Sequence, residues 1–257
     1  MPTRYMVYPY KQNSEGAIAL ADALDGKRIL REGSRYQYRD TDVLINWGAG
    51  DCPYPQALNS DVKGCIEKRE FFRRLAGSPY IPKFTLNRAS ALGALDFPIV
   101  CRTRTTGHDG EGIVIADNAD QMVDARLYTQ LVDKTAEYRV HIGRKPDGSV
   151  TIIGAQKKLH RGAPEGVDER VWVGEGTVFV WTVGGVVVDD FMPEIVRIAA
   201  HEVFDKFPEL TFGAFDIVYH TYTSPGAVAL EINSAPMMTP ETARRYAEFF
   251  KLFATGE

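Results

Sequence analysis

The most constraining feature of the sequence is a pair of apolar stretches near its end, FGAFDIVYH and AVALEINSAP, each carrying an acidic residue. Asp216 lies in the first stretch, where a carboxylate is costly unless it is paired or bound to a cation. In the second, Glu231 and Asn233 are two residues apart and share one face of a strand. A short turn joins the stretches, so we expect antiparallel neighbours on which the three side chains meet. They suit Mg²⁺ held jointly with phosphate oxygens; the alternative is three separately solvated side chains.

Composition excludes several classes of protein. The chain has 257 residues, 44% of them hydrophobic, and a formal net charge of -4. That charge argues against a general nucleic-acid binder or a protein of acidic membranes. The cysteines Cys52, Cys65 and Cys101 fit neither a zinc pattern nor a disulfide framework, which favours a reducing cytoplasm. The sequence has no signal-peptide core and no apolar run of membrane-spanning length.

The order of secondary-structure signals predicts an α/β (α+β) chain. Residues 4–10, 14–24, 28–32 and 42–48 alternate strand and helix signals, which indicates a small Rossmann-like unit with a partly parallel sheet, although no GxGxxG is present. A Gly- and Pro-rich loop then leads to a helix over 63–78. From Thr135 the pattern becomes mainly β, with strands expected over 136–144, 149–160, 212–221 and 227–233, and an amphipathic helix closes the chain.

The segment RTRTTGHDGEG joins two expected strands through a glycine-rich turn. Its glycines allow the backbone to approach a ligand and present N–H groups to it. Arg102 and Arg104 lie on one face of the preceding strand, within reach of phosphate oxygens. The alternative is a mobile surface turn. The glycines concerned are Gly107, Gly110 and Gly112.

The segment YTQLVDKTAEYRVHIG marks a joint between two parts of the chain. Backbone groups beside apolar side chains at such a joint can bind a flat base. Glu137 and Arg139 lie on one face of the strand that follows, where Glu137 can accept hydrogen bonds from a ribose and Arg139 can bind phosphate or a carboxylate. The alternative is an exposed strand face of alternating charge. AQKKLHRG adds further cations, Lys157 among them.

Taken in order, these segments resemble the ATP-grasp superfamily from about Lys63 to the end, and FDIV…ALEINSAP carries the most specific part of the likeness. The EYRVHI segment and the N-terminal pattern also resemble phage-encoded ATP-grasp proteins. The resemblance implies an ATP-grasp fold in which a Rossmann-like pre-ATP-grasp domain precedes two α+β subdomains that grip ATP. The implied spans are 1–62, 63–130 with the flap, and 131–257 with the metal site.

The resemblance also implies roles for individual residues. Arg102 stands where the family usually has Lys, so a planar guanidinium replaces a compact charge. Arg139 and Arg102 are implied as catalytic, with Arg139 on the transferring phosphoryl group or the substrate carboxylate. The remaining assignments are Lys68, Arg102 and Lys157 for phosphates, Gly107, Gly110 and Gly112 for the flap, Gln130, Leu131, Val132 and Asp133 for adenine, Glu137 for ribose, and Asp216, Glu231 and Asn233 for two Mg²⁺ ions, or Mn²⁺.

The implied function is an ADP-forming carboxylate–amine ligase that uses ATP and Mg²⁺ to activate a carboxylate as an acylphosphate. A phosphotransferase on the same scaffold and a catalytically silent nucleotide-binding protein are the alternatives. The expected partners are small-molecule or peptide carboxylates and amines, with no general nucleic-acid binding and no membrane. We expect a cytoplasmic location, in a host cytoplasm if the protein is phage-encoded. The sequence leaves the oligomeric state and the identity of the substrates open.

Overall fold

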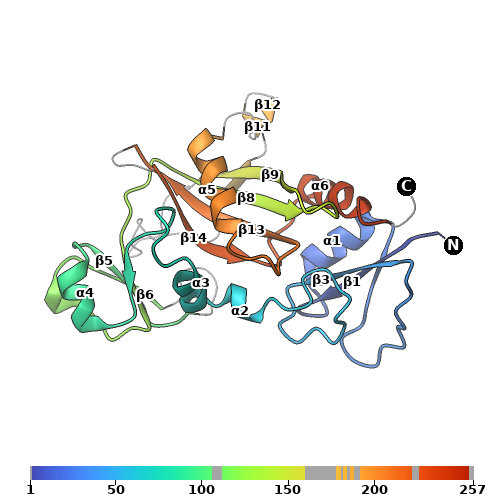
Figure 1. The fold of residues 1–257 in the computed structure, drawn as a ribbon, viewed down its shortest axis with the longest axis horizontal. Helices are drawn as coiled ribbons and strands as arrows, with labels where there is room; N and C mark the ends of the chain where they lie inside the picture. Colours follow the sequence, from blue (N-terminus) through green and yellow to red (C-terminus); the bar gives the residue numbers. More distant parts are fainter. Residues whose placement is uncertain are drawn as a thin grey trace.

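The computed structural model describes residues 2–105, 112–159, 178–180, 182–183, 186–187, 192–221 and 226–254, with residues 66, 159, 178–180, 182–183 and 186–187 described by their backbone alone. Figure 1 shows the central sheet between two smaller units: the N-terminal unit lies on one side beside the C-terminal helix, and a second sheet lies on the other. No helix within the described ranges is long and apolar enough to cross a membrane.

The N-terminal unit is a three-stranded sheet with one helix, and its pairing is parallel throughout where the sequence predicts a partly parallel sheet. The strand order is β2-β1-β3. Ser14 begins the helix by accepting a hydrogen bond from the backbone N–H of Ala17. The second strand covers two residues, fewer than expected. The elements are β1 (Arg4–Pro9), α1 (Glu15–Ala23), β2 (Lys27–Arg28) and β3 (Asp42–Trp47).

The single helix predicted over 63–78 is two helices, α2 (Lys63–Ile66) and α3 (Lys68–Arg74). The break falls at Glu67, whose backbone is extended and whose side chain accepts from the N–H of Glu70. Lys68 is therefore the first residue of α3. The buried apolar residues of this region belong to the core of the central sheet: Val62, Cys65, Phe71, Phe72 and Leu75.

The second sheet, which we call the flap sheet, has the strand order β4-β7-β5-β6 and antiparallel pairing throughout. It has a separate core that includes Ile99, Cys101 and Tyr128. The predicted flap residues Gly107 and Gly110 lie outside the described residues. The elements are β4 (Phe84–Thr85), α4 (Arg88–Ala94), β5 (Ile99–Arg102), β6 (Ile113–Ala116), the 3-10 turn η1 (Ala119–Gln121) and β7 (Leu127–Gln130).

The central sheet is antiparallel, with the order β10-β9-β8-β13-β14. Helix α5 (Glu194–Phe204) covers one face and shares its core with Val140 and Ile217. Helix α6 (Pro240–Lys251) packs beside α1 in a core that includes Trp47 and Phe212. The strands are β8 (Ala136–Arg144), β9 (Val150–Leu159), β10 (Val178–Val180), β13 (Phe212–Tyr219) and β14 (Ala227–Asn233), and β11 (Thr182–Val183) pairs with β12 (Val186–Val187).

The cores partly cross the spans that the sequence assigns to subdomains. Helix α3 belongs to the 63–130 span but packs under the central sheet, and α6 belongs to the last span but packs on the N-terminal unit. The boundaries after 62 and 130 remain predictions.

Candidate nucleotide and metal site

Four polar side chains form a row across the central sheet. Asp216 is paired directly with Glu231 on β14 and with Arg139 on β8, and Arg139 is paired with Gln156 on β9. Residues directly opposite in antiparallel strands point to the same face. Tyr138 and Ile217, next to them in the chain, belong to the core shared with α5. The row therefore lies on the face turned away from α5, which we call the site face.

The carboxylate of Asp216 lies between two cations. Arg139 Nε and Nη2 donate to its two oxygens at 2.7 and 2.9 Å, and Lys158 Nζ donates to Oδ2 at 2.7 Å. Burial by itself raises the pKa of Asp216, but the charges of Arg139 and Lys158 outweigh it and hold that pKa well below its usual range. Asp216 is therefore ionised although only 4% of it is exposed.

Glu137 joins the same network from the neighbouring row. Lys158 Nζ lies 2.5 Å from its Oε1, and Lys134 Nζ lies 3.0 Å from its Oε2. Burial lowers the pKa of Lys158, yet Asp216 and Glu137 raise it above its ordinary value. The resemblance implied Lys157 as the phosphate-binding lysine of this strand, but Lys157 is paired with core residue Tyr138 and so points to the α5 face. Lys158 is thus the lysine of β9 on the site face.

Glu231 is bound by a cation from α3. Lys68 Nζ lies 2.8 Å from Glu231 Oε2, and the N–H of Lys68 donates to the carbonyl of Thr105 beside the flap. Asn233 Nδ2 lies 3.5 Å from Glu231 Oε1. Lys68 therefore links the end of the flap sheet to the predicted metal-binding strand.

Arg102, at the end of β5, brings a further cation toward Glu231. Its Nε is enclosed and has no hydrogen-bond partner among the described residues. Burial lowers the pKa of Arg102, and the charge of Glu231 partly restores it. A desolvated guanidinium nitrogen without a partner costs free energy unless an anion binds to it. Gly112, with a φ of 72°, accepts from the N–H of Thr103 and so closes the base of the flap hairpin.

The donor chemistry of this face fits a hard divalent cation in part. Asp216, Glu231 and Asn233 offer the carboxylate and amide oxygens that Mg²⁺ binds. Among the described residues, however, no three His, Cys, Asp or Glu side chains are placed to bind a metal by themselves. The predicted ligands would therefore need oxygens from phosphate or water to complete the coordination, which is usual for Mg²⁺. Their metal-binding role remains a prediction.

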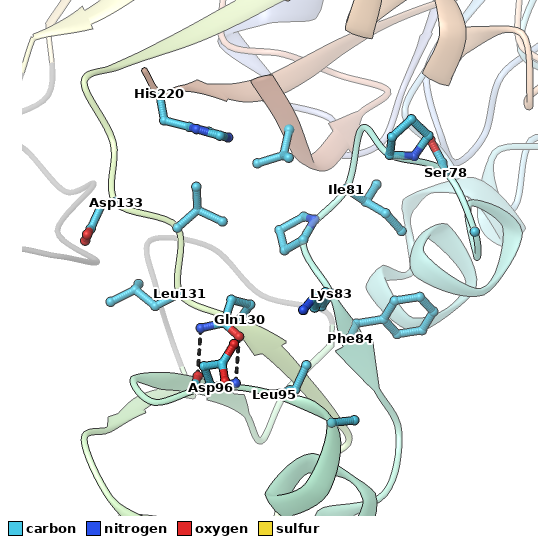
Figure 2. Close-up of a pocket in the computed structure, with 16 residues that line it drawn as sticks. Ser78, Ile81, Lys83, Phe84, Leu95, Asp96, Gln130, Leu131, Asp133 and His220 are labelled. Atoms are coloured by element: carbon cyan, nitrogen blue, oxygen red, sulfur yellow. Dashed lines mark hydrogen bonds between the residues drawn. The ribbon is translucent and has the colours of Figure 1, made fainter. Parts of the chain in front are cut away.

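A cavity of about 740 Å³ adjoins the segment that connects β7 to β8. Leu131, Val132 and Asp133 line it, and no hydrogen bond among the described residues uses the backbone N–H of Val132 or Asp133. Gln130 also lines it, but Figure 2 shows that its amide is bound to the backbone of Asp96, with Nε2 donating to O at 2.7 Å and Oε1 accepting from N at 2.9 Å. Gln130 thus fixes the connection, and the backbone after it is the part left to bind a base.

Sequence reasoning gave no specific role to three residues of this region, although it counted Lys158 among the cations of AQKKLHRG. Lys158 and Lys134 pair with Glu137, and His220 lines the cavity from the end of β13. Lys134 is three residues before Glu137, a spacing that the sequence displays. His220 is four residues after Asp216, so alternation along the strand already places both on one face.

Comparisons with known proteins identify the fold. No protein-family model matches the chain, and no curated protein matches it. Among solved structures, the ATP-grasp ligase PsnB complexed with a minimal precursor has a TM-score of 0.63 at 10% identity, over 98% of this chain and 99% of that one. D-alanine–D-alanine ligase from Bacillus anthracis has 0.61 at 16%, over 98% and 95%. N5-carboxyaminoimidazole synthetase from Staphylococcus aureus, complexed with ADP, has 0.61 at 10%, over 97% and 78%.

At these identities the similarity concerns the fold. The chain has the ATP-grasp fold, so the fold class predicted from the sequence is confirmed.

Proposed function

We propose that the protein is an ATP- and Mg²⁺-dependent ligase that activates a carboxylate as an acylphosphate and releases ADP. The observation that carries the proposal is the direct pairing of Asp216 with Glu231 on a face where cationic side chains outnumber carboxylates. Such a face attracts a polyphosphate and offers oxygen ligands for its counter-ion. Two of the similar structures are ligases by name, and one contains ADP.

The nucleotide lies along the site face in this proposal. Its base occupies the cavity lined by Leu131, Val132 and Asp133, where the N–H groups of Val132 and Asp133 make no hydrogen bond among the described residues and apolar side chains form part of the wall. Glu137, one row from Asp216, is positioned for the ribose hydroxyls. The triphosphate then lies near Asp216 and Glu231. Lys68, Arg102 and Lys158 supply the charges that neutralise it, and the enclosed Nε of Arg102 gains the partner that it lacks among the described residues.

Asp216, Glu231 and Asn233 would hold Mg²⁺ in this arrangement. When bound, the ion supplies charge neutralisation between the phosphates and the incoming carboxylate. The side chains of the protein orient the groups around it. Arg139, fixed by two hydrogen bonds to Asp216, presents its guanidinium toward the transferring phosphoryl group or the substrate carboxylate.

The proposed reaction has two steps. A carboxylate oxygen attacks the γ-phosphorus, the bond to the β–γ bridging oxygen breaks, and ADP leaves with that electron pair. An amine nitrogen then attacks the carbonyl carbon of the acylphosphate, inorganic phosphate leaves, and the nitrogen loses a proton. Positioning and charge neutralisation carry both steps, so no nucleophilic side chain is required. The acceptors are small-molecule or peptide carboxylates and amines.

Product analysis tests the reaction class. The protein is incubated with ATP, Mg²⁺, a carboxylate panel labelled with ¹⁸O, and hydroxylamine as a general nucleophile. The proposal expects ADP, a hydroxamate detectable by mass spectrometry, and ¹⁸O in the released phosphate. Phosphate retained on the product would instead indicate a phosphotransferase. Binding of ATP with no ADP across the panel would indicate a silent nucleotide-binding protein.

A pair of variants tests the site itself. Glu231→Gln keeps the shape of the side chain and removes its charge, whereas Glu248→Gln makes the same change on α6, where Glu248 is paired with Arg244. We expect E231Q to reduce Mg²⁺-dependent binding of a non-hydrolysable ATP analogue by at least tenfold and E248Q to leave it unchanged, measured by calorimetry. Equal Mg²⁺ dependence in both variants would contradict the assignment of Glu231.

A further inference from the structure

His220 is a buried polar side chain at the edge of the cavity. It is 6% exposed and is one of the residues that line the cavity. Figure 2 shows its imidazole projecting from the end of β13 into the space between the segment of Leu131 and Asp133 and the segment of Ile81. The backbone of His220 is held in position, because its N–H donates to the carbonyl of Gly226.

The imidazole of His220 has no hydrogen-bond partner within the described part of the chain. A histidine ring always carries at least one N–H donor, and in its neutral form the other nitrogen is an acceptor. The enclosed side-chain nitrogens that lack a partner among the described residues are Arg102 Nε and Arg144 Nε, so the ring nitrogens of His220 are not enclosed. They open onto the cavity that His220 lines, and they are available to hydrogen-bond a group that binds there.

The position of His220 on the site face identifies which part of the ligand it meets. It is four residues after Asp216 on β13, so it lies on the same face at about 13 Å along the strand. Val218, between them, is opposite Glu137. The carbonyl of Tyr219 accepts from the N–H of Thr135, which brings this strand end beside the connection after β7. His220 thus lies beyond the predicted ribose position, away from the phosphate-binding cations.

We propose that His220 hydrogen-bonds the purine base of the nucleotide and contributes to the choice of that base. The proposal rests on the nucleotide binding proposed above. Adenine presents ring-nitrogen acceptors and an exocyclic amine donor, so one nitrogen of the imidazole can either donate to a ring nitrogen or accept from the amine. The backbone N–H groups after Gln130 then bind the base from one wall of the cavity and His220 binds it from the strand end.

Binding of two probes tests the proposal. The first probe is a non-hydrolysable ATP analogue with Mg²⁺, and the second is inorganic tripolyphosphate with Mg²⁺, which has no base. His220→Phe retains an aromatic ring and removes both nitrogens, and His220→Gln retains a donor and an acceptor. His201→Phe, on α5, is the control. We expect H220F to weaken binding of the ATP analogue about three- to tenfold, which corresponds to the loss of one net hydrogen bond. The affinity for tripolyphosphate should not change.

The other outcomes are equally decisive. H220Q should bind the analogue more tightly than H220F, because glutamine retains a donor and an acceptor. If thermal melting shows that H220F does not fold, the affinity of H220Q for the two probes is compared with that of the wild type instead. Analogue binding by H220F at the wild-type affinity would overturn the role of His220 and leave the proposed function intact. An equal loss for both probes would also overturn it, because the effect would not concern the base. Wild-type protein that binds neither probe would overturn the proposed function, and the role of His220 with it.

Discussion

Replacement of Lys158 by Met, with Lys157→Met as its matched control, tests the reasoning about the charged face most directly. The two lysines are adjacent on β9 and point to opposite faces of the sheet. Lys158 lies between Glu137 and Asp216, and these three side chains are 3%, 4% and 6% exposed. Lys157 forms no ion pair with any described residue. The same chemical change therefore meets two different environments.

The loss of stability expected in K158M depends on the hydrogen-bond and ion-pair partners that Asp216 and Glu137 retain. Removal of one partner from a buried ion pair costs about 3–5 kcal/mol, because a buried charge is left uncompensated. In K158M, Asp216 retains both hydrogen bonds from Arg139, and Glu137 retains Lys134. We therefore expect the lower end of that range, about 3 kcal/mol. K157M should lie within about 0.5 kcal/mol of the wild type.

Thermal unfolding at pH 7 provides the assay. A loss of about 3 kcal/mol lowers the midpoint of a chain of this size by about 6–12 °C. The K157M midpoint should stay within about 2 °C of the wild type, by the same conversion. The reasoning is refuted if the two variants melt together, because Lys158 would then not hold the buried carboxylates. A larger loss in K157M would place the wrong lysine on the site face.

Three further expectations follow from single residues. Burial lowers the pKa of His141 to about 3, so below pH 6.5 the unfolded chain binds a proton that the folded chain does not. The free energy of unfolding therefore falls as the pH is lowered from 6.5 toward 3. His141→Gln should reduce the slope of unfolding free energy against pH between pH 5 and 6 by the equivalent of about one proton. Gly143→Ala brings a Cβ within 2.4 Å of the Phe249 ring and should cost about 1–3 kcal/mol in urea titrations, whereas Gly93→Ala, with open space around it, should cost nothing. Arg102→Met should weaken Mg²⁺–ATP binding about tenfold or more in calorimetry, and a Met variant of wild-type affinity would exclude a phosphate contact.

Much of the fold could be predicted because its signals are local. Continuous apolar stretches mark β13 and β14, the PDG turn marks the hairpin of β8 and β9, and Ser14 marks the start of α1. The break at Glu67 was missed because KGCIEKREFF continues a helical pattern, whereas the backbone there is extended and the side chain caps α3. At the break the N–H of Lys68 donates to the carbonyl of Thr105, a contact between residues far apart in the chain that no local signal reports.

The pairing of Lys158 could not be predicted by counting along the hairpin. Arg144 is paired with Val150, so counting outward from the turn places Lys157 opposite Glu137. A β-bulge between His141 and Ile142 adds one residue to β9 and brings Lys158 there instead. A shift of one residue reverses the faces, and the sequence carries no strong signal for the bulge.

A second bulge has the same consequence on the other side of the site. Tyr219 is paired with Ala227, and by simple counting Asp216 would oppose Leu230; the irregularity between Asp216 and Ile217 brings Glu231 opposite instead. The extra residue in each bulged strand exchanges the two faces of the strand beyond it, which brings Lys158 on β9 and Glu231 on β14 to the site face. Because bulges are enriched beside functional sites, their presence on both flanks of Asp216 is an independent reason to place the chemistry there.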